Sequence, residues 1–221
     1  MKVLLSWSTG KDSAWTLHVL RHEGVRVGGL LCSINAEARR ASMHGVREEI
    51  LRAQADATGL PLQTVALPCP CTNEMYEQRM AEAVARAAAD GFTHVAFGDL
   101  FLADVRRYRE ERMKGTGLTP LFPLWGRPTP ALAREMVAGG LRARIACVDP
   151  RTTPREFAGA EFDAALLARL PSAVDPCGER GEFHTCVTAG PMFSSPLSLA
   201  TGEVVERDRF VFCDLVLAEG R

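Results

Sequence analysis

The sequence has little lysine, almost no net charge and no long apolar run. Of its 26 basic residues only three are lysine, so a lysine inside a polar motif stands out as a site that needs a compact ammonium group. The net charge of −1 excludes attraction of a polyanion by bulk charge, and we expect no nucleic-acid partner. No apolar run approaches the roughly 20 residues of a membrane-spanning helix. The chain passes from Lys2 directly into a strand-like run without a signal peptide, so we expect a cytoplasmic protein with no membrane partner.

The first half of the chain alternates strand-like and helix-like segments. The whole chain of 221 residues is 47% hydrophobic, which suffices for one large or two small domains. Short links between alternating strands and helices predict parallel strands with crossover helices. The expected strands are 3–7, 27–32, 62–67, 94–98 and 119–123, and the expected helices are 12–23, 46–57, 73–90 and 102–114.

The second half changes to short strands punctuated by glycine and proline. Helices are expected at 129–138 and 163–170, and strands at 144–148, 184–187, 197–199, 203–207 and 210–217. We expect the strands after Pro171 to form two antiparallel hairpins. A boundary near Gly126 divides the chain into two predicted domains, 1–126 for ATP and 127–221 for substrate recognition.

A polar loop separates the first expected strand from the first helix. Its residues are Ser6, Trp7, Ser8, Thr9, Gly10, Lys11, Asp12 and Ser13. A helix N-terminus offers unpaired amides to phosphate, and Gly10 permits close backbone approach. The hydroxyl groups can donate to phosphate oxygens, Lys11 can neutralise charge, and Asp12 can cap the helix or hold magnesium. The order S-x-G-K-D-S is neither of the commoner glycine loops, and it resembles the PP-loop of ATP pyrophosphatases.

Three further segments are unusually polar for their position. His44, in Ser42-Met43-His44-Gly45, either contacts the nucleotide or caps a helix. Asp99 follows a strand at the edge where ligands bind, and either binds magnesium or a substrate amine or caps the next helix. The segment Asp175–Thr185 gathers carboxylates, a cysteine and a histidine around two glycines. Such density of titratable groups is typical of a functional site, although a solvated acidic loop is the alternative.

Together these motifs resemble one family. The loop, Met43-His44-Gly45, Gly98-Asp99-Leu100-Phe101 with Tyr108-Arg109-Glu110, and Cys177-Gly-Glu-x-Gly-Glu-Phe-His-Thr are similar to the diphthine–ammonia ligase-like family of ATP pyrophosphatases. The resemblance implies an α/β fold of HUP type, a Rossmann-like parallel sheet with helices on both faces, plus a smaller C-terminal α+β domain. It also implies an enzyme that uses ATP and magnesium to adenylate a carboxylate, small or protein-borne, and transfers ammonia to it. A homodimer is one assembly that we consider.

The expected site residues follow from the loop and the resemblance. For ATP binding they are Ser6, Ser8, Thr9, Gly10, Lys11, Asp12, Ser13, His44 and Gly98, with Asp12 as the magnesium ligand. For substrate binding they are Cys177, Gly178, Glu179, Glu182, His184 and Thr185. For catalysis they are Lys11, Asp12, Asp99, Glu179 and Glu182, one of the two glutamates orienting the amine or accepting its proton.

Two positions depart from the family pattern, and three other functions remain open. Thr9 stands where a glycine is usual, and His184 where the diphthine-modifying members have a glutamate. One alternative is adenylation or thiolation of RNA with Cys69, Cys71, Cys177 or Cys186, and another is an ATP-binding sensor without chemistry. Zinc binding by these cysteines and His184 is a third, although their spacings match no standard pattern.

Overall fold

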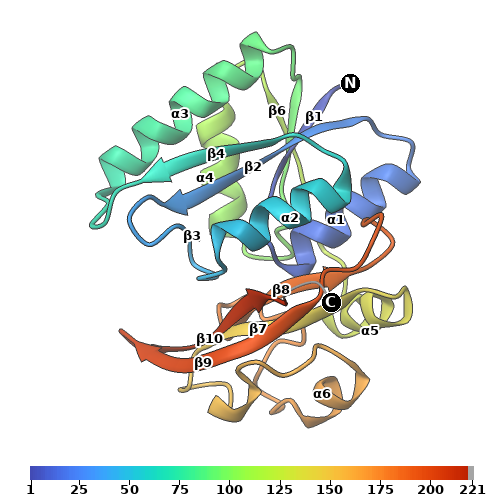
Figure 1. Ribbon diagram of the computed structural model, residues 1–221. Helices are drawn as coiled ribbons and strands as arrows, with labels where there is room; N and C mark the ends of the chain where they lie inside the picture. The colour runs from blue at the N-terminus through green and yellow to red at the C-terminus, as the bar shows by residue number, and fades with distance from the viewer. Residues whose placement is uncertain (219–221) are drawn as a thin grey trace.

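The computed structural model describes residues 1–218, whose first half forms sheet A and its helices (Figure 1). The parallel strands have the order β4-β2-β1-β5-β6, and short β3 pairs antiparallel with β2. The strands are β1 (Val3–Ser6), β2 (Val27–Asn35), β3 (Arg40–Ala41), β4 (Leu62–Leu67), β5 (His94–Ala96) and β6 (Thr119–Leu121). The helices are α1 (Lys11–His22), α2 (Glu48–Thr58), α3 (Asn73–Ala89) and α4 (Ala103–Met113). The chain builds outward from β1 through β2 and β4, then reverses through β5 and β6. This reversal is the topological switch point at which open α/β sheets bind ligands.

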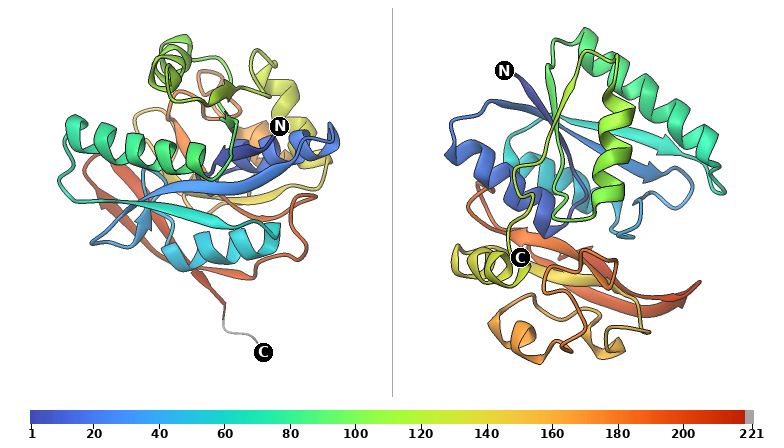
Figure 2. Two further views of the ribbon diagram at one scale, coloured as in Figure 1. Left: turned by 90° about the horizontal axis from the view of Figure 1, so that it is seen from above. Right: turned by 180° about the vertical axis from the view of Figure 1, so that it is seen from behind.

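Helices cover both faces of sheet A (Figures 1 and 2). α3 and α4 lie on one face, where Ala83, Val84 and Ala87 of α3 pack with Leu4 and Val65 of the strands. α1 and α2 lie on the other face, between sheet A and the second half of the chain. The predicted α/β class with a parallel sheet and helices on both faces is confirmed. No helix of the described residues is long and apolar enough to cross a membrane.

The second half forms sheet B, an antiparallel sheet with the order β8-β7-β10-β9. Its strands are β7 (Arg142–Val148), β8 (Phe183–Ala189), β9 (Leu199–Arg207) and β10 (Phe210–Leu217), accompanied by α5 (Thr129–Ala138), a short 3-10 turn η1 (Arg155–Phe157) and α6 (Ala164–Arg169). The prediction of two separate hairpins is wrong, because β7 lies between β8 and β10 and only β9 and β10 form a hairpin among the described strands. The expected strands 197–199 and 203–207 belong to one strand, β9, which continues through Gly202.

Sheet B packs against α1 and α2, so that the two halves share a hydrophobic core. Leu17 of α1 and Ile50 of α2 belong to the same buried cluster as Ile145 of β7 and Val187 of β8. The chain leaves sheet A at Leu121 and enters α5 at Thr129. Whether 1–126 and 127–221 are separate domains stays a prediction.

Gln54 forms hydrogen bonds to residues of both halves within this shared core. No motif in the sequence indicated it. Its buried side chain accepts from the indole N–H of Trp7 (2.9 Å) and donates to the carbonyl oxygens of Thr9 (3.1 Å) and Val187 (2.7 Å). We expect Gln54→Leu to lower the free energy of unfolding by about 2 to 4 kcal/mol, because it leaves buried polar groups unpaired. Urea denaturation measures the change, with exposed Gln78→Leu as the control. A loss no larger than that of the control would contradict the bridging role.

Candidate active site

The loop between β1 and α1 is organised by its own serines. The Ser13 hydroxyl donates to the Gly10 carbonyl (3.0 Å) and accepts from the Ser8 amide (3.3 Å). The Ser8 and Ser13 hydroxyls are 3.2 Å apart. The Gly10 carbonyl also accepts from Ala14 and so begins the hydrogen bonds of α1. The loop therefore brings the helix N-terminus and two hydroxyl groups to the switch point of sheet A.

Strand β8 of sheet B holds the loop through two hydrogen bonds. The Lys11 amide donates to the Thr185 hydroxyl (3.0 Å), and the Val187 amide donates to the Thr9 carbonyl (2.9 Å). Thr9 adopts φ +70°, a left-handed conformation that disfavours a β-branched residue. Its hydroxyl is buried without a hydrogen-bond partner among the described residues. The departure from glycine at this position thus places backbone strain in the loop.

Lys11, which is buried, and Asp12, which is partly buried, form an ion pair at the start of α1. The Lys11 ammonium lies 2.8 Å from Asp12 Oδ2 and also donates to the Cys177 carbonyl. Burial lowers the pKa of Lys11, but the Asp12 carboxylate and other nearby groups outweigh burial and raise it above its ordinary value. Lys11 therefore stays positively charged. The second oxygen, Asp12 Oδ1, is buried and has no hydrogen-bond partner within residues 1–218, so it is free to bind a cation.

A cavity of about 640 Å³ opens beside this pair, within the size range of small-molecule sites. Most of the predicted site residues line it: Ser6, Ser8, Lys11, Asp12, Ser13, His44, Gly98, Asp99, Cys177, Gly178, Glu179, His184 and Thr185. Thr9, Gly10 and Glu182 do not line it. Their predicted roles in binding and catalysis stay predictions, as do those of the lining residues.

Apolar residues of sheet A and α3 form another wall, which no sequence motif indicated. Leu31, Val95 and Phe97 come from β2, β5 and the loop after β5, and Met80 and Val84 come from α3. In the sequence they are indistinguishable from ordinary core positions. Their presence gives the cavity one apolar side and one polar side.

Asp99 pairs with Arg109, which was not among the predicted site residues. The Arg109 guanidinium donates to both carboxylate oxygens, at 2.5 Å and 3.1 Å, and both residues line the cavity. The residue that caps α4 is Leu102, so the alternative of Asp99 as a helix cap is wrong. The only signal for Arg109 was its place in the family motif Tyr108-Arg109-Glu110.

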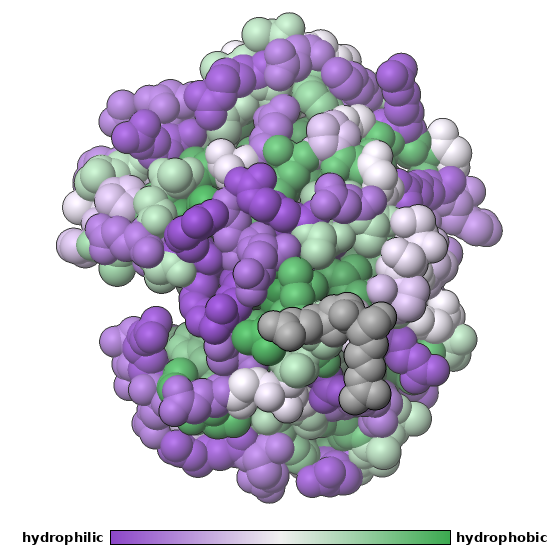
Figure 3. All heavy atoms as spheres, viewed as in Figure 1, coloured by the Kyte–Doolittle hydropathy of each residue, from purple (hydrophilic) through white to green (hydrophobic). Residues whose placement is uncertain are grey.

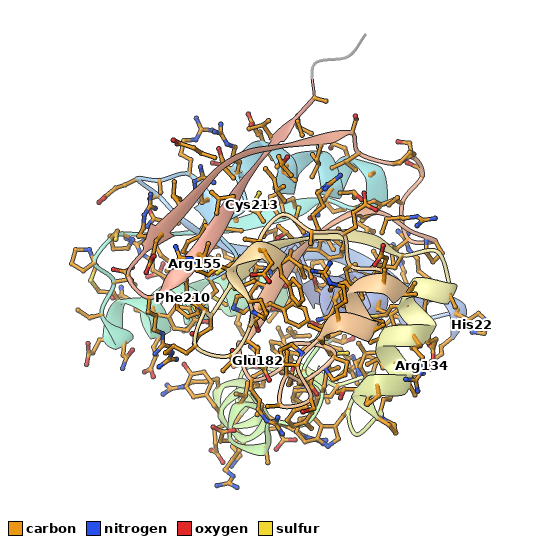
Figure 4. All side chains as sticks on the ribbon, turned by 90° about the horizontal axis from the view of Figure 1, so that it is seen from below. His22, Arg134, Arg155, Glu182, Phe210 and Cys213 are labelled. Carbon is orange, nitrogen blue, oxygen red and sulfur yellow. The ribbon has the colours of Figure 1, made fainter. Side chains whose placement is uncertain are left out.

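Glu179 and Glu182, equivalent in the sequence motif, have different surroundings. Glu179 lines the cavity and accepts from the amides of Leu100 (2.7 Å) and Phe101 (3.4 Å), which links the loop before β8 to the loop before α4. Glu182 (labelled in Figure 4) accepts from the amides of Asp175 (3.0 Å) and Arg180 (2.9 Å). Both oxygens of Glu182 thus hold its own loop in shape.

Burial raises the pKa of Glu179 to about 7, although the Leu100 amide acts in the opposite direction. The unfolded chain releases the Glu179 proton near the ordinary pKa of 4.5, whereas the folded protein keeps it until the pH approaches 7. The retained proton stabilises the folded protein at low pH, and this stabilisation is lost as the pH rises toward 7. We expect Glu179→Gln to flatten the decline in unfolding free energy between about pH 5 and about pH 7. Urea denaturation tests this, with exposed Glu203→Gln as the control; identical pH profiles for wild type and Glu179→Gln would contradict it.

Two neutral histidines face each other where the halves meet. The rings of His44 and His184 are 4.7 Å apart, and His44 Nδ1 lies 3.1 Å from the Thr185 carbonyl. Burial lowers the pKa of His44 to about 3 and that of His184 to about 4. α1 and α2 are capped by Gly10 and Arg47, so the alternative of His44 as a helix cap is wrong. The pair adds polar but uncharged groups to the cavity.

The cysteines do not form a reactive or metal-binding cluster among residues 1–218. Burial raises the pKa of Cys177 and of Cys186 to about 12, so neither thiol is ionised at neutral pH. Cys69 and Cys71 are exposed, whereas Cys177 and Cys186 are buried. No group of three or more His, Cys, Asp or Glu residues in the described part of the chain is arranged to hold a metal ion.

The parallel sheet, its switch-point cavity and the S-x-G-K-D-S loop define a PP-loop protein of the HUP type. Residues 1–120 match the family model of the diphthamide synthase N-terminal domain. Because this match covers more than half of the chain, the chain belongs to that family.

Three curated proteins named diphthine–ammonia ligase are similar to the chain. The chain is 27% identical over 234 residues to a diphthine–ammonia ligase of Schizosaccharomyces pombe, covering 97% of this chain and 39% of the relative. It is 33% identical over 110 residues to those of Rattus norvegicus and Homo sapiens, covering 47% of this chain and 41% of each relative. The chain thus spans about two fifths of the length of the curated relatives that it matches.

Among solved structures, one from Methanocaldococcus jannaschii, described as a predicted subunit of tRNA methyltransferase, is 15% identical with a TM-score of 0.44. That comparison covers 89% of this chain and 100% of the other.

Proposed function

We propose that the protein is an ATP-dependent ligase that adenylates a carboxylate, releases pyrophosphate, and transfers ammonia to form an amide. The observation that carries the proposal is that one cavity gathers the PP-loop, the unpartnered Asp12 oxygen and a glutamate with a raised pKa. The names of the curated relatives support the same reaction class.

In this proposal the phosphates of ATP lie against the N-terminus of α1, where amides and the Ser8 and Ser13 hydroxyls can donate to them. The charged Lys11 stabilises the negative charge that develops on departing pyrophosphate. The apolar wall of Leu31, Met80 and Phe97 suits the face of an adenine ring. Magnesium, when bound, would supply positive charge to the phosphate oxygens, and Asp12, whose Oδ1 has no hydrogen-bond partner among the described residues, would hold it.

Glu179 is the residue best placed to move a proton in the second step. A carboxyl group with a pKa of about 7 is partly ionised at neutral pH, and can accept a proton from ammonia as the nitrogen attacks the acyl-adenylate. Cys177 supplies no nucleophile, because its thiol stays protonated. The proposed reaction needs positioning and charge stabilisation, and no covalent protein intermediate.

Sheet B then provides the acceptor side of the cavity. Residues 1–126 would carry the ATP site and 127–221 the side chains that meet the acid, with Glu179 and His184 at the junction. The reaction would take place in the cytoplasm with free ammonia as the amine donor.

The test is product analysis after incubation with ATP, magnesium, ammonium and candidate carboxylic acids. We expect AMP and pyrophosphate in equal amounts, formed only when an acid is present, together with the amide of that acid. Formation of ADP and phosphate would contradict the proposal, and tight ATP binding without AMP for any acid would favour the sensor hypothesis.

A further inference from the structure

A second groove of about 460 Å³ lies next to the nucleotide cavity. Its walls are the segment 40–45, the loop 68–71 after β4, and the β9–β10 hairpin. Figure 3 shows this side of the molecule hollowed between its upper and lower parts, and Figure 4 labels Phe210 and Cys213, two of the lining residues on β10. The groove therefore forms where sheet B faces the loops of sheet A.

The groove and the nucleotide cavity share a wall. Ser42, Met43, Leu67, Cys71 and His184 line both of them. A molecule in the groove would thus reach the nucleotide cavity beside His184, whose ring stacks near His44. An acid bound there would lie beside the cavity in which we propose that the nucleotide binds.

The groove is apolar inside. Leu67, Val205, Phe210 and Phe212 line it, and Phe212 packs so closely on Gly45 that a Cβ there would come within 2.9 Å of its ring. Aromatic and aliphatic walls of this kind favour the hydrocarbon body of a small molecule. A recess of this volume, bounded on three sides, suits a small molecule better than a folded protein surface.

The rim of the groove carries two guanidinium groups, those of Arg40 and Arg207, and two carboxylates, those of Asp208 and Asp214. The Arg40 guanidinium is engaged, 2.9 Å from the Asp214 carboxylate, which also binds Arg47 at 2.6 Å. Arg207, at the tip of the hairpin, lines the groove and makes no ion pair with any residue of the described part of the chain. Its guanidinium is thus free to attract a carboxylate as the acid enters.

We propose that this groove binds the acceptor of the reaction, and that the acceptor is a small carboxylic acid with an apolar body. The body lies between Leu67 and the hairpin, and the carboxylate points to the wall at His184. That the bound acid is the acceptor rests on the proposed function, whereas its binding in the groove does not.

The test is calorimetric titration of the full chain with octanoate, 3-phenylpropionate and 1-naphthylacetate. Val205→Trp fills the groove, and Val204→Trp is the matched control because neighbouring residues of a strand point to opposite faces. Arg207→Gln tests the charge, with the exposed Arg134→Gln on α5 as its control (Figure 4). Titration with ATP checks that each variant keeps its fold and its nucleotide cavity.

We expect at least one of the three acids to bind the wild type and Val204→Trp equally, and Val205→Trp to weaken that binding by about tenfold or more. Arg207→Gln should weaken it by about three- to fivefold, and Arg134→Gln should not. Binding of ATP should stay unchanged in all four variants. No binding of any of the acids, or equal binding by Val205→Trp, overturns the proposal. If the acid binds as described but no AMP forms, the proposed reaction fails while the groove assignment stands.

Discussion

Replacing Lys11 by methionine should lower the formation of AMP and pyrophosphate by about a hundredfold to a thousandfold, which is the usual cost of removing a charged stabiliser of a transition state. The ammonium of Lys11 is the buried positive charge of the loop, held by Asp12 and by the Cys177 carbonyl. Methionine keeps much of the side-chain length and removes the charge. Steady-state assays of pyrophosphate release measure the effect.

The controls must separate lost catalysis from lost folding. Lys114→Met removes a charge from an exposed side chain that pairs only with Glu111 among the described residues, and should leave activity unchanged. Lys11→Met alone leaves the partly buried Asp12 carboxylate without its partner, which costs stability. The double variant Lys11→Met with Asp12→Asn removes both charges, so its melting temperature should recover toward that of the wild type while its activity stays low. Near-normal activity in either Lys11 variant would contradict the role.

Gly98→Ala should weaken ATP binding, because the added methyl group would displace the backbone at the start of α1. Gly98 lies so close to α1 that a Cβ there would come within 2.9 Å of the Asp12 carbonyl carbon and 3.1 Å of the Ser13 amide nitrogen. The start of α1 would have to move away from β5, at a cost of about 1 to 3 kcal/mol in unfolding free energy. Because the loop amides are set by that position, we expect ATP affinity to fall by about tenfold or more.

A second glycine separates loss of stability from loss of the site. Gly59 ends α2 at φ +69°, and a Cβ added there would meet no heavy atom of residues 1–218 within 4 Å. Gly59→Ala should therefore cost about 1 kcal/mol through backbone strain alone and leave ATP affinity unchanged. Calorimetry and urea denaturation of both variants provide the comparison. Equal ATP affinity in Gly98→Ala and Gly59→Ala would show that the close approach at Gly98 does not position the loop.

Sheet A could be predicted from the sequence and sheet B only in part, for a physical reason. Strands β1, β2 and β4 are apolar runs with glycine or proline nearby, and local pattern suffices for such segments. β9 is largely exposed, so its residues do not alternate and Gly202 suggests a break. The place of β7 between β8 and β10 depends on pairing across distant segments, which no local pattern contains.

Some residues of the candidate site could likewise be predicted from the sequence, and others could not. Motif residues such as Lys11, Asp12 and Glu179 could be singled out, because five polar residues around one glycine in this order, or several carboxylates around glycines, are rare outside sites. Gln54 could not, since its polar side chain on α2 suggests a solvated position. The motif also could not show that the two oxygens of Glu182 accept from backbone amides of its own loop, and the catalytic role of Glu182 stays a prediction.

The two hydrogen bonds from β8 to the phosphate loop have a thermodynamic consequence. Thr185, which binds the Lys11 amide, is next to His184, which lines both the proposed acceptor groove and the proposed nucleotide cavity. A ligand that holds β8 in place from the groove side would therefore also hold the loop that we propose binds the phosphates. Coupling of this kind is reciprocal. ATP and the acid should each tighten the binding of the other, so that neither the nucleotide nor the acceptor reaches its full affinity alone.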